Sequence, residues 1–169
     1  RSAAKAINFG IVYGISSFGL ARGTGISRTE AQEYIDRYFQ RYSKVKEYLD
    51  STVAEARKQG YVTTILGRRR YLPEINSRNW TRRQFAERMA MNTPVQGSAA
   101  DLIKLAMLAV EQRIKQEGLR ARMLLQVHDE LLFEYPDAER DTLAAAVKEE
   151  MEGVLQLAVP LLVEITTGD

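Results

Sequence analysis

The sequence contains no cysteine and a single histidine, His128. The lack of cysteine excludes disulfides, thiolate zinc sites and a cysteine nucleophile, and one histidine excludes every zinc site that needs two. No apolar run reaches the roughly 18 residues that a membrane-spanning helix requires. The chain also begins with neither methionine nor a signal peptide. We therefore expect neither a disulfide-stabilised nor a membrane protein, and we expect a piece of a longer chain.

Charge is unevenly distributed along a chain of otherwise ordinary composition. The 169 residues are 45% apolar and 27% charged, close to the average of soluble globular domains. Residues 1–100 hold 17 Lys/Arg against 8 Asp/Glu, whereas residues 101–169 hold 7 against 14. The basic part predicts a polyanionic partner, and the acidic part predicts either a cation site or a solvated surface.

Periodicity and end signals predict three helices in the first part of the chain. Ser27 is a good N-cap, and Glu30 three residues later completes a capping box. The helices are expected over residues 1–14, 27–39 and 44–59, the last capped by Ser43 and ended by Gly60.

The rest of the chain predicts an α+β arrangement. A hairpin is expected over residues 61–72, and a helix over 81–116 that breaks or bends near Pro94 and Gly97. Strands are then expected over 122–127, 131–135 and 161–166, with a helix between the last two that Asp137 caps and that runs to about residue 157. Such an order predicts a small antiparallel sheet with helices on one face.

The first helix carries a stripe of Arg1, Lys5, Phe9 and Tyr13, each four residues after the last. Residues spaced by four share one face of a helix, and this stripe is about 18 Å long. Two cations can hold phosphate oxygens, and two rings can lie against a sugar or a base. An ordinary amphipathic helix with both rings in the core gives the same spacing.

A second candidate is the acidic turn His128-Asp129-Glu130 between two apolar runs. Adjacent carboxylates repel each other unless a cation compensates, and Mg²⁺ prefers oxygen ligands. A solvated turn is the alternative reading, because aspartate is common in turns. The turn contains neither glycine nor asparagine, which favours a chemical role.

Arginines dominate residues 61–100, which hold seven of them and two acidic residues. The run Arg68-Arg69-Arg70 can neutralise backbone phosphates, although a solubilising surface has the same composition. Asn92 and Gln96 follow, four residues apart on one helix face. Amides at that spacing can contact base edges in a groove, but helix-face amides are often only solvated.

Together these segments resemble the family A DNA polymerases. The pattern Arg1-x3-Lys5-x3-Phe9-x3-Tyr13-Gly14 resembles motif B, and residues 126–130, Gln-Val-His-Asp-Glu, resemble motif C. Residues 69–73 and 86–97 are similar to the segments between those motifs. The resemblance covers essentially the whole chain, in the family's order and spacing.

The resemblance implies a role for each motif residue. Arg1 and Lys5 would contact the triphosphate of an incoming dNTP, Phe9 its sugar and base, and Tyr13 the template position. Asp129 would hold catalytic magnesium, with Glu130 in support, and Lys5 would stabilise developing charge. The residues implied to contact primer–template DNA are Arg69, Arg70, Arg88, Asn92, Gln96 and His128.

The resemblance also implies a fold and a reaction. Residues 1–75 would form part of the fingers and 76–169 the C-terminal part of the palm. The reaction would be phosphoryl transfer from a dNTP to a primer 3′-hydroxyl, assisted by two Mg²⁺ ions. The family's motif A, which supplies the second metal-binding aspartate, is absent from these 169 residues. We therefore expect little activity from this chain alone.

The implied setting is a monomeric bacterial enzyme in the cytoplasm, associated with the nucleoid and not with a membrane. Two other functions remain open. A non-catalytic nucleic-acid-binding module would need the arginines but not the carboxylates. A metal-dependent nuclease would use Asp129 and Glu130 but leaves the stripe of residues 1–13 unexplained.

Overall fold

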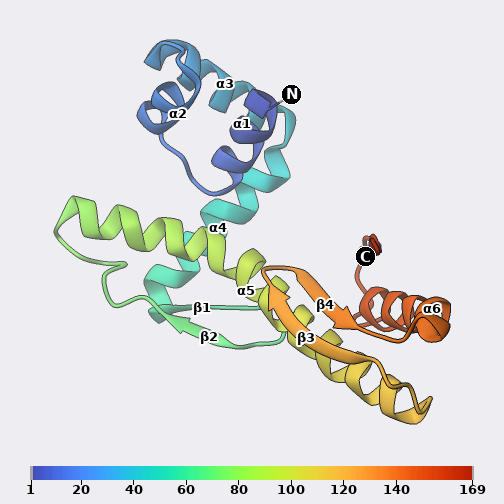
Figure 1. Cartoon of the computed structure of the whole chain (residues 1–169). Helices are drawn as coiled ribbons and strands as arrows, with labels where there is room; N and C mark the ends of the chain where they lie inside the picture. Colours follow the sequence, from blue (N-terminus) through green and yellow to red (C-terminus); the bar gives the residue numbers. More distant parts are fainter. Residues whose placement is uncertain (1, 169) are drawn as a thin grey trace. The chain divides into compact units, whose positions relative to one another are not determined.

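The computed structural model describes residues 2–168, and in the first helix it describes side chains from Ile7 onward. Helices make up most of the described chain, with two separate antiparallel hairpins, so the expected α+β class is confirmed (Figure 1). In chain order the elements are α1 (Ser2–Val12), α2 (Ser17–Thr24), α3 (Arg28–Arg41), α4 (Ser43–Gln59), β1 (Tyr61–Thr63), β2 (Arg69–Tyr71), α5 (Trp80–Gln116), β3 (Arg122–Val127), β4 (Glu130–Glu134), the 3₁₀ turn η1 (Asp137–Glu139) and α6 (Arg140–Glu152).

The chain divides into two compact units, residues 1–97 and residues 98–169. We call them the N-terminal and the C-terminal unit. The division falls within α5, after Gly97. The functional division expected between residues 75 and 76 stays a prediction. Within the described residues, none of the helices combines the length and the apolar character that crossing a membrane requires.

The core of the N-terminal unit joins α4, the β1–β2 hairpin and the start of α5. Small residues of the two helices let the hairpin approach closely, because an alanine leaves room for a neighbouring backbone. Val53 and Met89 pack against this core from its edge. The buried members are Ala56, Val62, Leu72, Ile75, Ala86 and Ala90.

The β1–β2 hairpin forms as the sequence predicts, with Tyr61 opposite Tyr71 and Thr63 opposite Arg69. Its loop is closed by two backbone hydrogen bonds. Thr64 N–H donates to the Arg68 carbonyl at 2.9 Å, and Gly67 N–H donates to the Thr64 carbonyl at 2.9 Å. Gly67 has a φ of 80°, a left-handed conformation that glycine adopts without a steric penalty.

The capping box at the start of α3 is confirmed. Ser27 Oγ accepts from Glu30 N–H at 3.2 Å, and Glu30 Oε2 accepts from Ser27 N–H at 2.9 Å. Helix α2, which the sequence reading missed, has similar signals. Ser16 Oγ accepts from Gly19 N–H, and Gly25 ends the helix in a left-handed conformation. Gly19 and Gly23 inside α2 lower its intrinsic helix propensity. The pattern of apolar residues therefore did not predict this helix.

Replacing Glu30 with Gln is expected to make the stability of the N-terminal unit less sensitive to acid. The Ser27 hydroxyl and then the Ser27 backbone N–H lower the pKa of the Glu30 carboxyl below its ordinary value. A carboxyl with a lower pKa in the folded state stabilises the fold above its unfolded pKa, and this contribution is lost as pH falls through the folded pKa.

Circular dichroism during heating checks this at about pH 7 and about pH 3, on either side of an ordinary glutamate pKa. The wild-type unfolding midpoint should fall further between the two pH values than the midpoint of Glu30→Gln. Equal falls of the two unfolding midpoints would show that the capping box does not make the stability of α3 depend on pH.

The expected cap at Ser43 and the expected break in α5 near Pro94 were wrong, whereas a bend there stays a prediction. Ser43 lies inside α4, and the N-cap is Tyr42, which makes no capping hydrogen bond with its side chain. Helix α5 runs through Pro94 without interruption. Proline lacks the N–H that would bond the carbonyl of Ala90, but Ala86 and Ala90 are fully buried. Packing of that face outweighs the lost backbone hydrogen bond.

The C-terminal unit packs the β3–β4 hairpin against α6 and the second part of α5. The buried residues of its main core cluster are Val110, Ile114, Ala121, Leu143 and Val147. An ion cluster joins the two helices. The Arg113 guanidinium pairs with Glu117, with Glu150 at 3.2 Å and with Glu149 at 3.4 Å. These carboxylates, the hydrogen-bonded Glu117 first, raise the pKa of Arg113.

The end of the C-terminal unit differs from expectation. Asp137 opens the 3₁₀ turn η1 and does not cap α6, whose N-cap is Glu139 without a capping side chain. Helix α6 ends at Glu152, and residues 161–166 form no strand. Val163 N–H donates to Glu152 Oε1 at 2.9 Å. Residues 161–166 therefore bond to the last residue of α6 through Val163, and their backbone pairs with no strand among the described residues.

Candidate functional site

The described part of the α1 stripe is a pair of stacked rings on the surface. The Phe9 and Tyr13 ring centroids lie 6.2 Å apart, with an interplanar angle of 27°. Phe9 is 51% exposed, whereas Ile11 is 1% exposed. The helix is therefore amphipathic with Phe9 outside the core, which differs from the ordinary-helix alternative. Arg1 lies outside the described residues, and so does the side chain of Lys5.

The end of α1 lies against α5. Gly14 follows Tyr13 with a φ of 74°. A Cβ at Gly14 would lie 2.4 Å from Met91 Cε and 3.4 Å from Arg88 Cγ. The backbone conformation at position 14 therefore disfavours a side chain, and any Cβ there would displace the end of Met91. This close approach brings the ring pair of α1 to the part of α5 that carries Arg88.

Arg88, Asn92 and Gln96 are spaced by four residues on α5. Arg88 and Asn92 are half-buried, and Gln96 is exposed. Asn92 Oδ1 is inaccessible to solvent and has no hydrogen-bond donor among the described residues. A buried acceptor without a donor costs about 1–3 kcal/mol. Such an atom indicates a position that serves something other than the stability of the described chain.

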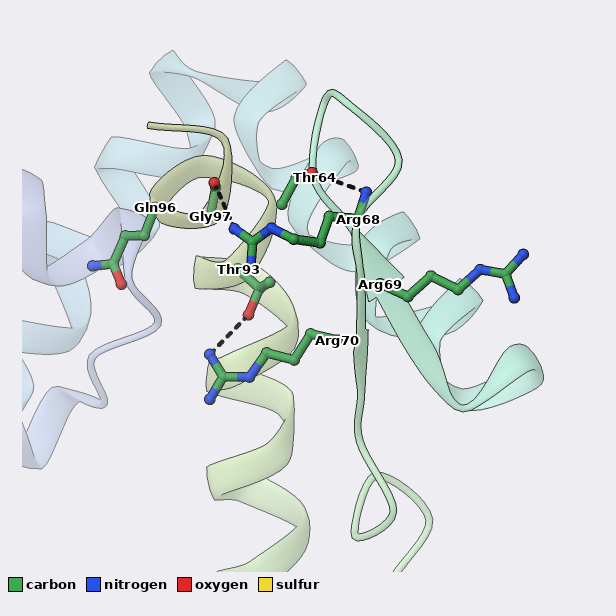
Figure 2. A pocket seen from close by; sticks show the side chains of 7 residues that line it. All are labelled: Thr64, Arg68, Arg69, Arg70, Thr93, Gln96 and Gly97. Carbon is green, nitrogen blue, oxygen red and sulfur yellow. Dashed lines mark hydrogen bonds between the residues drawn. The ribbon is translucent and has the colours of Figure 1, made fainter. Parts of the chain in front are cut away.

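The arginine run borders a cavity of about 270 Å³ between the β1–β2 hairpin and α5. Figure 2 shows Arg68 and Arg70 directed toward α5, and Arg69 directed away from it. Successive side chains of a strand point to opposite faces, which explains this division. The residues that line the cavity are Thr64, Arg68, Arg69, Arg70, Thr93, Gln96 and Gly97.

Each arginine of the run has different neighbours. Arg68 Nη2 donates to the Gly97 carbonyl at 3.1 Å. Arg70 donates to Thr93 Oγ1 at 3.3 Å and to Met89 Sδ at 3.1 Å. The Arg69 guanidinium carbon lies 4.8 Å from the centre of the Tyr61 ring. The sequence reading treated the three as one basic patch, and it missed Thr64 and Thr93.

His128 and Asp129 form the two-residue turn between β3 and β4, where Val127 pairs with Glu130. His128 has a φ of 57°, a left-handed conformation that few non-glycine residues adopt, although asparagine, aspartate and histidine adopt it more often than the others. Gln126 Nε2 donates to the His128 carbonyl at 2.8 Å and holds the turn. His128, Asp129 and Glu130 are all exposed. Strained backbone of this kind is typical of functional sites.

The acidic turn fits part of a magnesium site. Its carboxylate oxygens have the right chemistry for Mg²⁺. Nevertheless, the residues that the structure describes contain no group of three or more His, Asp or Glu able to hold a metal ion. A complete site therefore needs ligands beyond Asp129 and Glu130.

The N-terminal unit contains three of these features: the Phe9–Tyr13 ring pair, the stripe of Arg88, Asn92 and Gln96 on α5 (the α5 stripe), and the cavity beside the run Arg68–Arg70. Within the C-terminal unit, it places His128, Asp129 and Glu130 at one exposed turn. Rings, arginines and amides can hold a nucleotide or a nucleic acid strand, and the turn can bind a cation.

Comparisons with known proteins found similar sequences that cover nearly the whole chain. A family profile described as DNA polymerase family A matches residues 1–169. The chain is 58% identical to DNA polymerase I of Bacillus caldotenax and 56% identical to that of Caldicellulosiruptor bescii, in each case over 168 residues and 99% of this chain. It covers 19% and 20% of those proteins, so it spans about a fifth of their length.

A solved structure is similar over nearly the whole chain. It is the POL domain of Pol1 from M. smegmatis, in complex with DNA primer-template and dNTP. The TM-score is 0.92 and the sequence identity 51%, with 95% of this chain and 28% of that chain covered. The similarity therefore extends from the sequence to the arrangement of helices and strands.

Proposed function

Since this chain belongs to DNA polymerase family A, we propose that it forms part of an enzyme that extends a DNA primer by copying a template. The primer 3′-oxygen attacks the α-phosphorus of a dNTP, a new phosphodiester bond forms, and pyrophosphate leaves. The observation that carries this proposal is the family match over all 169 residues, together with the polymerase domain that shares the fold.

The α1 stripe provides the dNTP contacts in this proposal. Arg1 and Lys5 hold the triphosphate, and Lys5 stabilises the charge that develops on it. Phe9 packs on the sugar and base, and Tyr13 stacks at the template position. The exposed Phe9 ring, stacked with Tyr13, supports these roles, because an aromatic face open to solvent can accept a base.

The turn between β3 and β4 provides the metal contact. Asp129 holds Mg²⁺ through its carboxylate, Glu130 supports it, and a second aspartate comes from outside these 169 residues. Two Mg²⁺ ions held in this way would lower the pKa of the primer 3′-hydroxyl and would stabilise the negative charge of the departing pyrophosphate. His128 contacts the primer terminus. The exposure of both carboxylates supports this role, since a ligand to a shared ion has to be accessible.

Primer–template DNA is held by the α5 stripe and by arginines of the hairpin. Arg88, Asn92 and Gln96 line the minor groove near the primer end. Arg69 and Arg70 contact the sugar–phosphate backbone. The exposure of the Gln96 amide supports this assignment, because its oxygen can accept from the donor that the minor groove presents at each guanine.

The proposal includes the setting of the enzyme. Residues 1–75 serve as part of the fingers and residues 76–169 as the C-terminal part of the palm. The enzyme works as a monomer in the bacterial cytoplasm, associated with the nucleoid.

Purified residues 1–169 are expected to give no measurable primer extension, whereas the longer polypeptide that contains them extends a primer. One carboxylate pair without a second aspartate cannot hold two dications in a catalytic arrangement. A gel assay with a labelled primer, template, dNTPs and Mg²⁺ measures the products of both. Extension by the 169 residues alone would contradict the need for outside ligands. A longer polypeptide that bound DNA without extending it would instead be a nucleic-acid-binding module.

A further inference from the structure

We propose that one face of α3 binds the unpaired template strand ahead of the primer end. Tyrosines and arginines alternate on this face. We call it the tyrosine–arginine stripe, and it consists of Tyr34, Arg37, Tyr38, Arg41 and Tyr42. The inference rests on the proposed function, and it adds a site for single-stranded DNA that shares no residue with the contacts assigned above.

The spacing of these residues places them on one side of α3. Successive members are three or four positions apart, and such steps return to the same face of an α-helix. On the opposite side, Gln32 Nε2 donates to Asp36 Oδ1 at 3.0 Å. The arginines of the stripe and the carboxylate of Asp36 therefore lie on different sides of the helix.

The stripe exposes aromatic surface that is held in place. Tyr34 is 43% exposed and Tyr42 is 51% exposed. Tyr38 is half-buried, and its ring centroid lies 4.9 Å from that of Tyr42. An exposed ring that rests on a second ring has less freedom to lose when it stacks on a base.

Tyr42 occupies a position where helix stability favours other residues. It is the N-cap of α4, and its side chain makes no capping hydrogen bond. Serine, threonine, aspartate and asparagine are preferred there, because their side chains accept from the first backbone N–H groups. Ser43 follows directly but lies inside the helix. A tyrosine at this N-cap therefore indicates a role other than helix formation.

The arginines of the stripe have no carboxylate partner among the described residues. Glu33 precedes Arg37 by four residues, the usual spacing of an ion pair. Nevertheless, Arg37 Nε donates to the backbone carbonyl of Glu33 at 3.4 Å, and the guanidinium carbon lies 4.9 Å from the centre of the Tyr34 ring. Lys44 of α4, by contrast, pairs with Glu47. Positive charges beside exposed rings suit a strand with an anionic backbone and flat bases.

An unpaired strand fits the stripe better than a duplex. The bases of a duplex stack on one another, so a protein side chain in a groove meets their edges and not their faces. From Tyr34 to Tyr42 the helix rises about 12 Å. At about 3.4 Å for each stacked nucleotide, this length corresponds to about three nucleotides of one strand.

The position of α3 in the N-terminal unit favours the template as that strand. Helix α3 packs against α2, and α2 packs against α1, which carries the proposed template contact of Tyr13. A polymerase has an unpaired strand ahead of the primer end, because that part of the template is still to be copied. The same strand can therefore continue from α1 onto α3.

The first test measures how the affinity of the longer polypeptide for a primer–template depends on the length of the unpaired template. Fluorescence anisotropy compares an overhang of about ten nucleotides with an overhang of one. The wild type should bind the long overhang about tenfold more tightly. Tyr42→Ser removes the ring and supplies a preferred N-cap residue, so α4 should form and yet this gain should be lost. Tyr42→Phe keeps the ring and should keep the gain.

The matched control is Tyr48→Ser, which removes a tyrosine of similar exposure, 48%, from α4 outside the stripe. It should leave the gain from the long overhang unchanged. Arg37→Gln should lower the salt slope of binding to the long overhang by about 0.7, the value for one phosphate of a single strand. The slope for the one-nucleotide overhang should stay that of the wild type.

A second measurement reports stacking directly. The fluorescent base 2-aminopurine, which is quenched when it stacks, replaces single template bases ahead of the primer end. At one position or more, its fluorescence should be lower with the wild type than with Tyr42→Ser, and Tyr48→Ser should match the wild type. Equal fluorescence with Tyr42→Ser and the wild type at every position would overturn the proposal.

Other outcomes separate this proposal from the function beneath it. If Tyr42→Ser weakens binding of both overhangs equally, the ring acts on the fold or on the duplex, and the proposal fails. It also fails if the loss appears only when a second strand is displaced ahead of the primer, because the stripe then binds that strand. A wild type that extends primers but binds both overhangs equally overturns the proposal and leaves the polymerase function standing. If the wild type neither binds nor extends a primer, the proposed function itself is wrong.

Discussion

Replacing Asp129 with Asn in the longer polypeptide is expected to lower kcat for primer extension by about 10³-fold or more. A bound metal ion provides several kcal/mol of transition-state stabilisation, and each 1.36 kcal/mol is a factor of ten in rate. Asparagine keeps the shape of the side chain but lacks the negative charge that holds a dication. Single-turnover extension measures the chemical step, and fluorescence anisotropy measures the affinity for primer–template DNA.

The affinity for DNA should change by less than about twofold, because the turn is exposed and the substitution removes no packing. The matched control is Asp141→Asn, an exposed aspartate in the first turn of α6 in the same unit. It should retain wild-type turnover. If Asp129→Asn lost turnover and DNA binding in equal measure, Asp129 would be a structural residue of the hairpin.

Replacing Lys5 with Ala is expected to lower kcat/KM for dNTP by about 10²-fold at saturating DNA. A charge-assisted hydrogen bond to a phosphate oxygen is about twice as strong as a neutral one. The attraction between a positive charge and the negative charge that develops nearby is stronger in the transition state than in the ground state. Loss of one such donor lowers kcat by about 10²- to 10³-fold. Lys5 lies one helical turn before Phe9 in α1, which places it beside the proposed base contact.

Steady-state extension at varied dNTP concentration measures this effect, and titration with primer–template DNA provides the comparison. DNA affinity should stay close to that of the wild type. Lys44→Ala is the control, because the Lys44 side chain is 87% exposed on α4 and pairs only locally with Glu47. An unchanged dependence on dNTP in Lys5→Ala would remove Lys5 from the nucleotide site.

The parts of the fold that the sequence predicted well are those with local causes. The capping box at Ser27 depends on residues three positions apart, and Gly60 ends α4 in a left-handed conformation. The β1–β2 hairpin follows from a short β-prone run on each side of Gly67. In each case, the residues that determine the structure are neighbours in the chain, so a sequence window contains them.

Two of the errors, at residues 161–166 and at Pro94, occurred where distant contacts decide. Residues 161–166 have the composition of a strand, but a strand also needs a partner, and the backbone N–H of Val163 bonds to Glu152. Pro94 is a helix breaker by local rules, yet tertiary packing keeps α5 intact through it. The candidate site shows the same division. Asp129 was predicted from its motif, whereas the Thr93 support for Arg70 depends on residues 23 positions apart.

Arg68 and Arg70 point toward α5 and Arg69 points away from it (Figure 2), so the function of the hairpin should depend strongly on the exact number of residues in β2. Inserting or deleting one residue in β2 shifts its register by one, which exchanges the residues on its two faces. The arginine now held by Thr93 would then face Tyr61, and its neighbour would turn inward, although the composition of the segment would hardly change. A length change that is harmless in an ordinary surface loop would therefore be more damaging here than the loss of a single charge.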